Sequence, residues 1–369
     1  MTKPIKVFLL VAFVFAPLFL RAQQADSPSA DSVQDRLYSV FEMSKASVVK
    51  VYAQKTVVVK DENGADKNLA TLDVGSGFIV GKDGIVMTSA YVTHRAKKIW
   101  IEWRGILLDA KNVGLDPLTT VSIVKIAGDF KSRDASIVTI DGTSPLPKVG
   151  TMLVGVSYEM GLPPSPRLGL SAGHNIEFGG TFLPTIYVRS TLLSPRGSTG
   201  GAVFDLNGKF VGMTIASIPE IGGSFILPAK AAAKIRDDIL LCGEPVYSWF
   251  GLRAEDADAS NGTKVVVSLV AENAPAKKGG FKIGDEIVEI NSKRVRNNTE
   301  LRDSTFFIRP GEIAQFKIKR GGKCMKLEVL AERMSSDIIK TAESNLTEQI
   351  EKNNGASKRS DIKSKSAKK

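Results

Sequence analysis

The sequence contains few of the residues that bind metals or support redox chemistry. Its 369 residues include only two histidines and two cysteines. His94 and His174 stand at no metal-ligand spacing from each other or from a cysteine, so we predict no metal site and no other cofactor. Cys242 and Cys324 are far apart along the chain, which favours free, buried thiols over a disulfide.

Long hydrophobic runs are scarce as well. Residues 7–20 are apolar, but the run is short and interrupted by a proline, which argues against a membrane span. Lys3 and Lys6 precede this run, and residues 20–22 end it with a small alanine. The order predicts a signal peptide of residues 1–22 and an exported protein. The alternative is an uncleaved membrane anchor.

Acidic residues are outnumbered, and the formal net charge is +11 at pH 7. The last segment is residues 335–369. Its first part is predicted to form an amphipathic helix with an apolar face of Ile339, Ala342, Leu346 and Ile350. Residues 355–369 then predict a disordered basic tail. We expect a solvated tail without a nucleic-acid partner, because export removes nucleic acid and no aromatic residue is present to stack on bases. Weak contact with the envelope surface is the alternative.

Short β-rich runs and glycine-containing turns dominate residues 46–227. This pattern predicts a mainly β domain built from barrels or a sandwich. Two helices are predicted to frame it. Residues 32–45 start with Ser32 as a helix cap, and residues 227–241 are helical by composition.

A pair of hydroxyl residues, Ser198 and Thr199, stands between Gly197 and the glycines at 200–201. A hairpin follows, with Asn207-Gly208 as its predicted two-residue turn. The segment resembles the G-N-S-G-G motif of trypsin-like serine proteases. In that motif, backbone N–H groups of the turn face the oxyanion of the acyl intermediate. The motif's serine falls on Thr199, and the oxyanion-hole N–H groups would belong to Gly197 and Thr199.

Two further motifs extend the resemblance to the HtrA (DegP-like) family. Residues 75–92 read GSGFIVGKDGIVMTSAYV and are similar to the family's G-S-G-x-I-x-x-x-G-x-I-x-T-N-x-H-V, with Tyr91 at the histidine. Residues 114–126 read GLDPLTTVSIVKI and are similar to D-P-x-x-D-x-A-x-x-K-I, with Thr120 at the aspartate. The resemblance therefore implies a catalytic triad whose three positions hold Tyr91, Thr120 and Thr199.

The same resemblance implies the fold, the assembly and a periplasmic or secreted location in a bacterial cell envelope. It predicts a chymotrypsin-like pair of six-stranded β-barrels over residues 30–241, followed by a PDZ-like domain over residues 245–333. Family members carry N-terminal aromatic residues that hold a homotrimer together. Tyr38 and Phe41 are candidates for this role, and ordinary core packing is the alternative for both.

The triad positions lack the groups that acyl transfer needs. A tyrosine has an unperturbed pKa of about 10, so Tyr91 is protonated at neutral pH and is a poor general base. Thr120 cannot carry the charge that stabilises an imidazolium, and a hydroxyl such as that of Thr199 is a weak nucleophile without a base. We therefore predict a catalytically degenerate pseudoprotease.

Two residues could restore activity. His94 follows Tyr91 by three positions and could act as the base, and Ser198 adjoins Thr199 and could supply the hydroxyl. The alternative is that His94 is a surface residue of a basic stretch. For His174 the expected role is a strand or loop position without catalytic function.

The PDZ-like domain is predicted from two stretches. Residues 274–291 read APAKKGGFKIGDEIVEIN and closely resemble the PDZ signature, and residues 298–308 read as the helix beside the peptide groove. A peptide would add as a strand along that groove. Its carboxylate would be bound by the loop WFGL, formed by Trp249, Phe250, Gly251 and Leu252. A groove filled by the protein's own chain is the alternative.

These features leave two main function classes. The first is an envelope protein that binds peptide C-termini or unfolded proteins as a pseudoprotease, chaperone or scaffold. The second is a serine-type endopeptidase with residual or unconventional activity. A tether that uses the basic tail is a weaker third class.

Overall fold

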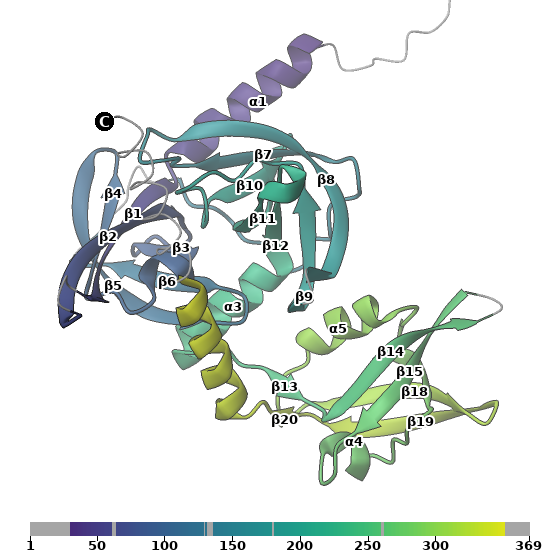
Figure 1. Cartoon of the computed structure of the whole chain (residues 1–369). Helices are drawn as coiled ribbons and strands as arrows, with labels where there is room; N and C mark the ends of the chain where they lie inside the picture. Colours follow the sequence, from purple (N-terminus) through teal and green to yellow (C-terminus); the bar gives the residue numbers. More distant parts are fainter. Residues whose placement is uncertain are drawn as a thin grey trace, which may run out of the picture.

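The computed structural model of the chain describes residues 30–60, 64–128, 130, 136–178, 181–259 and 262–350 (Figure 1). The predicted signal peptide of residues 1–22 and the predicted basic tail of residues 355–369 lie outside the described residues. Among the helices of the described ranges, none is long and apolar enough to cross a membrane. The fold is mainly β, as predicted, with two barrels followed by a smaller unit that has its own sheet.

The first six strands close into an antiparallel barrel with the order β1-β2-β3-β6-β5-β4. They are β1 (Val48–Lys60), β2 (Asp66–Ile79), β3 (Ile85–Ser89), β4 (Lys98–Trp103), β5 (Ile106–Asp116) and β6 (Val121–Ile126). Alternate residues of a strand face the interior, and β-branched side chains suit such positions. The barrel core accordingly contains Val49, Val51, Val86, Ile101 and Val124.

The second barrel also has six antiparallel strands, in the order β10-β11-β12-β9-β8-β7. They are β7 (Met152–Ser157), β8 (Ser165–Phe178), β9 (Thr181–Ser190), β10 (Ala202–Asp205), β11 (Phe210–Ile218) and β12 (Gly223–Pro228). One buried cluster joins Val154 and Met213 of this barrel to Phe78, Met87 and Ile123 of the first. The two barrels therefore share a continuous core across the seam where a chymotrypsin-like site would lie.

The predicted N-terminal helix is confirmed as α1 (Ala30–Lys45), which packs on β7 and β8. Val40 is buried, and Phe41 packs against the core that the barrels share. Phe41 is therefore a core residue, which was the alternative role considered for it. Tyr38 is 65% exposed and remains available for contact with a second copy of the chain. The homotrimer stays a prediction.

The helix predicted at residues 227–241 is α3 (Ala229–Cys242). Pro228 precedes it as the last residue of β12, which explains its later start, and Gly243 ends it in a left-handed conformation. The hairpin between β10 and β11 also differs from prediction. The Asp205 N–H donates to the Lys209 carbonyl at 2.9 Å, so its loop has three residues, 206–208, rather than two.

The unit that follows has a six-stranded sheet. Its elements are β13 (Ser248–Trp249), β14 (Leu252–Ala259), β15 (Gly262–Val270), α4 (Pro275–Lys278), β16 (Glu286–Ile290), β17 (Lys293–Arg294), α5 (Asn298–Phe306), β18 (Ile313–Arg320), β19 (Lys323–Leu330) and β20 (Glu332–Arg333). Phe316 contacts the ring edges of Phe250 and Phe281 at centroid distances of 5.7 and 5.1 Å in the core. The predicted groove helix is α5, and it packs on β9 of the second barrel as well as on β14.

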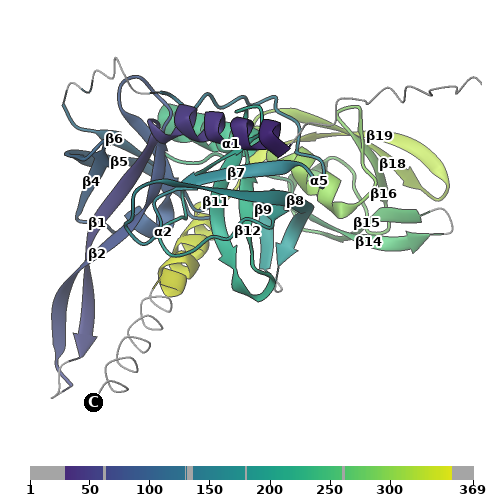
Figure 2. The same ribbon diagram turned by 90° about the horizontal axis from the view of Figure 1, so that it is seen from above.

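The chain then turns back to the barrels. Residues 336–350 form the predicted amphipathic helix, drawn in yellow in Figure 1 and called the C-terminal helix below. Ile339 packs against the shared core of the barrels, and Leu346 is only 2% exposed. Figure 2 shows the helix extending from the barrels at the side where α2 (Ala90–Thr93) lies.

The two cysteines are free, as predicted, but both are exposed, so their predicted burial is wrong. Cys242 is the last residue of α3, directly after the solvent-exposed Leu241. Cys324 lies on β19, which is an edge strand of its sheet. Each cysteine lies at or near the end of its helix or strand, where its side chain stays at the surface and packs into no core.

Candidate functional site

The three predicted triad positions lie on segments that meet at the seam between the barrels. Tyr91 lies in α2 after β3, Thr120 in the turn between β5 and β6, and Thr199 in the loop between β9 and β10. The Ala90 N–H donates to the Thr120 carbonyl at 2.7 Å and joins the first two segments. The Ser76 N–H donates to the Thr199 carbonyl at 3.2 Å and ties the third to β2.

Gly75 explains how these segments come so close. A Cβ atom at this position would lie 2.3 Å from Cγ2 of Val92 in α2 and 3.5 Å from the Thr199 carbonyl oxygen. A glycine is therefore needed where β2 passes between α2 and the Thr199 loop. The close approach of the segments that hold Tyr91 and Thr199 thus depends on this glycine.

Tyr91 is half-buried, and its hydroxyl donates a hydrogen bond to Oε1 of Gln349 in the C-terminal helix at 2.6 Å. Burial raises the pKa of Tyr91 above its ordinary value, because removal from water disfavours the phenolate. The side chain at the predicted base position is thus protonated and already acts as a donor. The Lys55 ammonium donates to the Tyr91 carbonyl at 2.8 Å and pairs with Asp73, which fixes the backbone of α2.

Thr120 has a left-handed backbone with φ of +59°, which is unfavourable for a β-branched residue. Its hydroxyl is buried and finds no partner within the described residues. The nearby Asp116, which the motif also contains, is fully buried. Its carboxylate accepts from Leu118 N–H, the Thr119 hydroxyl and the Tyr247 hydroxyl, and burial raises its pKa. The Asp116 side chain therefore holds its own turn and the interdomain linker through these hydrogen bonds.

The Thr199 loop, where the oxyanion turn is predicted, is shaped by two glycines. Gly197 and Gly200 have φ values of +93° and +89°, and a Cβ at Gly200 would lie 2.2 Å from the Ser76 carbonyl oxygen. The Ser76 hydroxyl donates to the Gly197 carbonyl at 2.7 Å and braces the loop. Over the residues that the structure describes, the N–H groups of Gly197 and Thr199 donate to no other protein group. Two backbone donors thus remain free to bind an oxygen atom of a ligand.

Ser198 does not offer a free hydroxyl. It is 4% exposed, and its Oγ donates to the Pro195 carbonyl at 2.6 Å and lies 2.8 Å from Oγ of Ser194. The side chain points into its own loop, because adjacent residues of a tight turn face different directions. The hypothesis that Ser198 acts as an alternative nucleophile is therefore wrong.

His94 is not the surface residue that the basic stretch suggested. It is 3% exposed, and its Nε2 lies 2.9 Å from the Thr347 hydroxyl while its Nδ1 lies 4.0 Å from Oε1 of Glu343. Burial lowers the pKa of His94, which favours the neutral ring. Both ring nitrogens face the C-terminal helix, so the proposed partnership of His94 with Ser198 or Thr199 is not formed. His174 lies in β8, as expected for a strand position.

The hollow next to the Thr199 loop is too small for a substrate side chain. It is lined by Leu192, Leu193, Ser198 and Thr214 among others, and its volume is about 10 Å³. That is about the space of one water molecule. A trypsin-like protease needs an open pocket here to hold the side chain before the cleaved bond.

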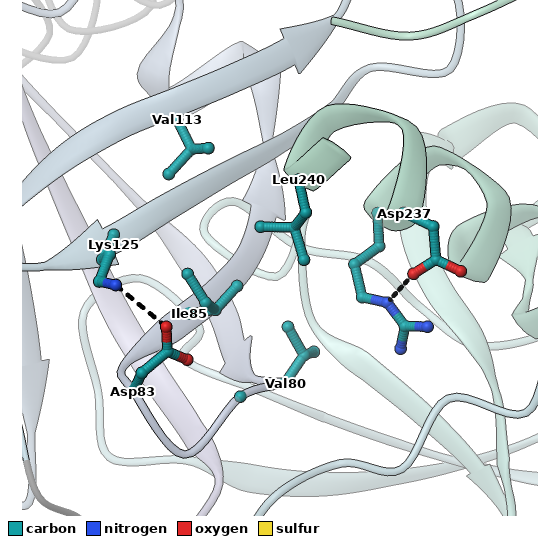
Figure 3. Close-up of a pocket in the computed structure, with 9 residues that line it drawn as sticks. Val80, Asp83, Ile85, Val113, Lys125, Asp237 and Leu240 are labelled. Atoms are coloured by element: carbon teal, nitrogen blue, oxygen red, sulfur yellow. Dashed lines mark hydrogen bonds and ion pairs between the residues drawn. The ribbon is translucent and has the colours of Figure 1, made fainter. Parts of the chain in front are cut away.

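A larger hollow of about 440 Å³ lies between α3 and the first barrel (Figure 3). Its apolar walls include Val80, Ile85, Val113 and Leu240. The ion pairs Lys125–Asp83 and Arg236–Asp237 flank it, with N–O distances of 3.0 and 2.8 Å. None of the triad positions lines this hollow. In the described chain no group of three or more His, Cys, Asp or Glu side chains is arranged to bind a metal.

The predicted carboxylate-binding loop joins β13 to β14, and β14 is an edge strand of its sheet. Gly251 has a φ of +69°, and a Cβ there would lie 2.2 Å from the Cβ of Ala274. Phe250 is buried in the core, Trp249 is half-buried in β13, and Leu252 begins β14. The Asn298 N–H at the start of α5 donates to the Asp256 carboxylate at 2.6 Å and joins the helix to β14. The loop therefore leads into an edge strand that packs against α5, and a PDZ-type site would add a peptide along such an edge.

Comparisons with known proteins define the class of protein. Residues 75–213 match the family described as trypsin-like peptidase domain, and residues 248–330 match the PDZ domain family. The solved structure "HtrA-type protease AlgW with decapeptide" superposes with a TM-score of 0.64 at 20% identity, covering 81% of this chain and 99% of that one. The serine endoprotease from Yersinia pestis gives a TM-score of 0.56 at 20% identity, over 81% of this chain and 98% of its own. The fold is thus a trypsin-like peptidase fold joined to a PDZ domain.

Sequence relatives narrow this class. A probable periplasmic serine endoprotease, DegP-like, from Ectopseudomonas mendocina is 26% identical over 75% of this chain and 60% of its own length. A protein with the same description from Brucella suis is 27% identical over 71% of this chain and 53% of its own. The chain thus spans between half and three fifths of the length of these relatives. The chain thus combines a trypsin-like peptidase domain with a PDZ domain and is similar to HtrA-type, DegP-like proteases, as the motifs predicted.

Proposed function

We propose that the protein is an exported, non-catalytic member of the HtrA family that binds peptides or unfolded proteins as a pseudoprotease, chaperone or scaffold. One observation supports this above all others. At the position of the general base stands Tyr91, a protonated phenol whose hydroxyl already donates to Gln349. Acyl transfer needs a base within reach of a nucleophile, and this arrangement offers neither an available base nor an orienting acid.

Binding without cleavage is supported by what the site retains. The N–H groups of Gly197 and Thr199 are free to bind a carbonyl or carboxylate oxygen of a peptide. The small hollow beside Ser198 does not hold a substrate side chain, which fits a binding surface better than a protease. A periplasmic location is supported by the predicted signal peptide and by relatives that are described as periplasmic.

The absence of proteolysis can be measured directly. We expect the purified mature protein to leave casein intact and to show no labelling by a fluorophosphonate probe, because no group activates the Thr199 hydroxyl. Thr199→Ala should behave identically in both assays. Cleavage or labelling that disappears in Thr199→Ala would instead support a serine-type endopeptidase with an unconventional base.

We propose in addition that the PDZ domain binds peptide C-termini through the loop at Gly251. A C-terminal peptide library, followed by fluorescence anisotropy on selected peptides, should yield ligands of the full-length protein. Amidation of the C-terminus should weaken their binding by about tenfold or more, because charged hydrogen bonds to backbone N–H groups are lost. Equal affinity for the acid and the amide would contradict a carboxylate-binding loop.

A glycine substitution gives an independent test of the same loop. We expect Gly251→Val to abolish peptide binding, because the left-handed φ and the short approach to Ala274 exclude a branched side chain. The matched control is Gly322→Val, which has a φ of +80° but open space around it, in the β18–β19 turn. The control should retain binding despite similar backbone strain.

A further inference from the structure

The C-terminal helix lies against the triad-equivalent site, and we propose that this site is a binding site for an amphipathic helix whose resident ligand is residues 336–350 of the chain itself. In this role Tyr91 and His94 are helix-binding residues. The inference rests on the proposed function in one respect, since a peptide that binds at Tyr91 would have to compete with the helix for this side chain. The contacts themselves do not depend on that function.

The first argument is the pattern of burial along the helix. Ile339, Ala342, Leu346 and Ile350 recur at helical spacing and form one face, and each is at least partly buried. On this face Ile339 packs against the core shared by the barrels, and Leu346 is 2% exposed. Ile338 is 42% exposed, although it too is an isoleucine of the same helix. The helix is therefore docked through a specific apolar face.

The second argument is the set of polar contacts made by α2. The Tyr91 hydroxyl donates to Oε1 of Gln349 at 2.6 Å, and His94 Nε2 lies 2.9 Å from the Thr347 hydroxyl. That hydroxyl donates to the Glu343 carbonyl at 2.9 Å, so it accepts its second hydrogen bond from His94. His94 thus carries its proton on Nε2 in this contact. Two side chains of the protease-like site each meet a matching group of the helix.

The third argument is the position of the helix relative to the other triad segment. A hollow of about 450 Å³ under its first turns is lined by Leu115, Pro117, Tyr247 and Ile339, among others. Leu115 and Pro117 flank Asp116, at the start of the turn that leads to Thr120. The helix therefore spans from this turn to α2 and covers the side of the seam that holds Tyr91.

The docking can be tested in the full-length protein by hydrogen–deuterium exchange. A helix of this length is marginal in water, so its amides are protected only while it is docked. Leu346→Glu should speed exchange across residues 336–350 by about 10-fold to 100-fold, as expected for the loss of one buried leucine. Ile338→Glu is the matched control and should leave exchange unchanged. Equal exchange in the two variants, or no change in Leu346→Glu, would overturn the proposal.

A second pair of variants changes exposed residues only, so loss of the fold does not complicate the measurement. Gln349 and Asn345 are both exposed on the helix, but only Gln349 contacts Tyr91. Gln349→Ala should raise exchange of residues 336–350 severalfold, whereas Asn345→Ala should not. Tyr91→Phe should reproduce the effect of Gln349→Ala and add nothing to it in the double variant. Additive effects would show that the two residues do not act on each other, and the proposed contact would be wrong.

A synthetic peptide of residues 336–350 tests the ligand class. It should bind the full-length Leu346→Glu protein, whose site is vacated, and bind the unmodified protein more weakly by about tenfold or more. The same peptide with Leu346→Glu should not bind. Failure of the intact peptide to bind the vacated site would refute helix binding. Binding of unfolded casein is measured separately, so the proposed function can fail while this inference stands.

Discussion

Replacing Tyr91 with histidine, Thr120 with aspartate and Thr199 with serine in one chain is expected to create fluorophosphonate labelling and slow casein cleavage. The segments that hold the three positions meet at the seam, because Gly75 and Gly200 leave room for their close approach. A positioned general base next to a serine accelerates the reaction by about 10²-fold to 10⁴-fold, because it accepts the proton of the attacking hydroxyl. We expect labelling to rise by at least about 10²-fold over the unmodified protein.

The aspartate should be tolerated especially well. Thr120 has a left-handed φ of +59°, and aspartate adopts that region more readily than a β-branched residue does. Thr120→Asp alone should therefore not destabilise the fold. Each single variant should remain inactive, because triad residues act as a unit and their effects are far from additive.

The C-terminal helix must be considered in this experiment. Tyr91→His removes the hydroxyl that donates to Gln349, and adding Leu346→Glu should open the site further. Labelling should be strongest in the variant with all four changes. A folded but inert variant would contradict the prediction and would show that the small hollow beside Ser198 has also lost its catalytic shape. Cleavage by the unmodified protein would contradict the pseudoprotease proposal itself.

A large loss of stability is expected when the buried carboxylate of α3 is removed. Asp238 is fully buried and pairs with Lys234 at 2.7 Å and with Arg309 of the PDZ domain at 2.7 Å. Lys234 is itself 7% exposed, and its ammonium also donates to the Val246 carbonyl at 2.6 Å. Asp238→Ala leaves this buried ammonium without its counter-charge. We expect the free energy of unfolding to fall by about 3–5 kcal/mol.

The neighbouring aspartate provides the control for this change. Asp237 pairs with Arg236 at 2.8 Å, but its side chain is 46% exposed. Asp237→Ala should lower the free energy of unfolding by about 1 kcal/mol or less, because water screens the pair. Urea unfolding of both variants measures the difference. Similar losses in the two would mean that the Lys234–Asp238–Arg309 network does not stabilise the junction between the barrels and the PDZ domain.

Much of the architecture could be predicted from local sequence patterns. The alternating strands, the glycine-rich Thr199 loop and the two framing helices each depend on neighbouring residues. The motifs also located Tyr91, Thr120 and Thr199, because each position lies inside a short segment with a characteristic spacing. Even the amphipathic helix of residues 336–350 was evident from the period of its apolar residues.

The partners of these segments were decided only by tertiary structure. His94 was expected at the surface because its neighbours are basic, but a helix some 250 residues later in the chain buries it. The sequence likewise could not show that Ser198 faces into its own loop or that Cys242 is exposed. A local pattern determines which side of a helix or turn is apolar. The surface that covers this side is determined by contacts between segments that are distant in the sequence, and the spacing of neighbouring residues does not encode such contacts.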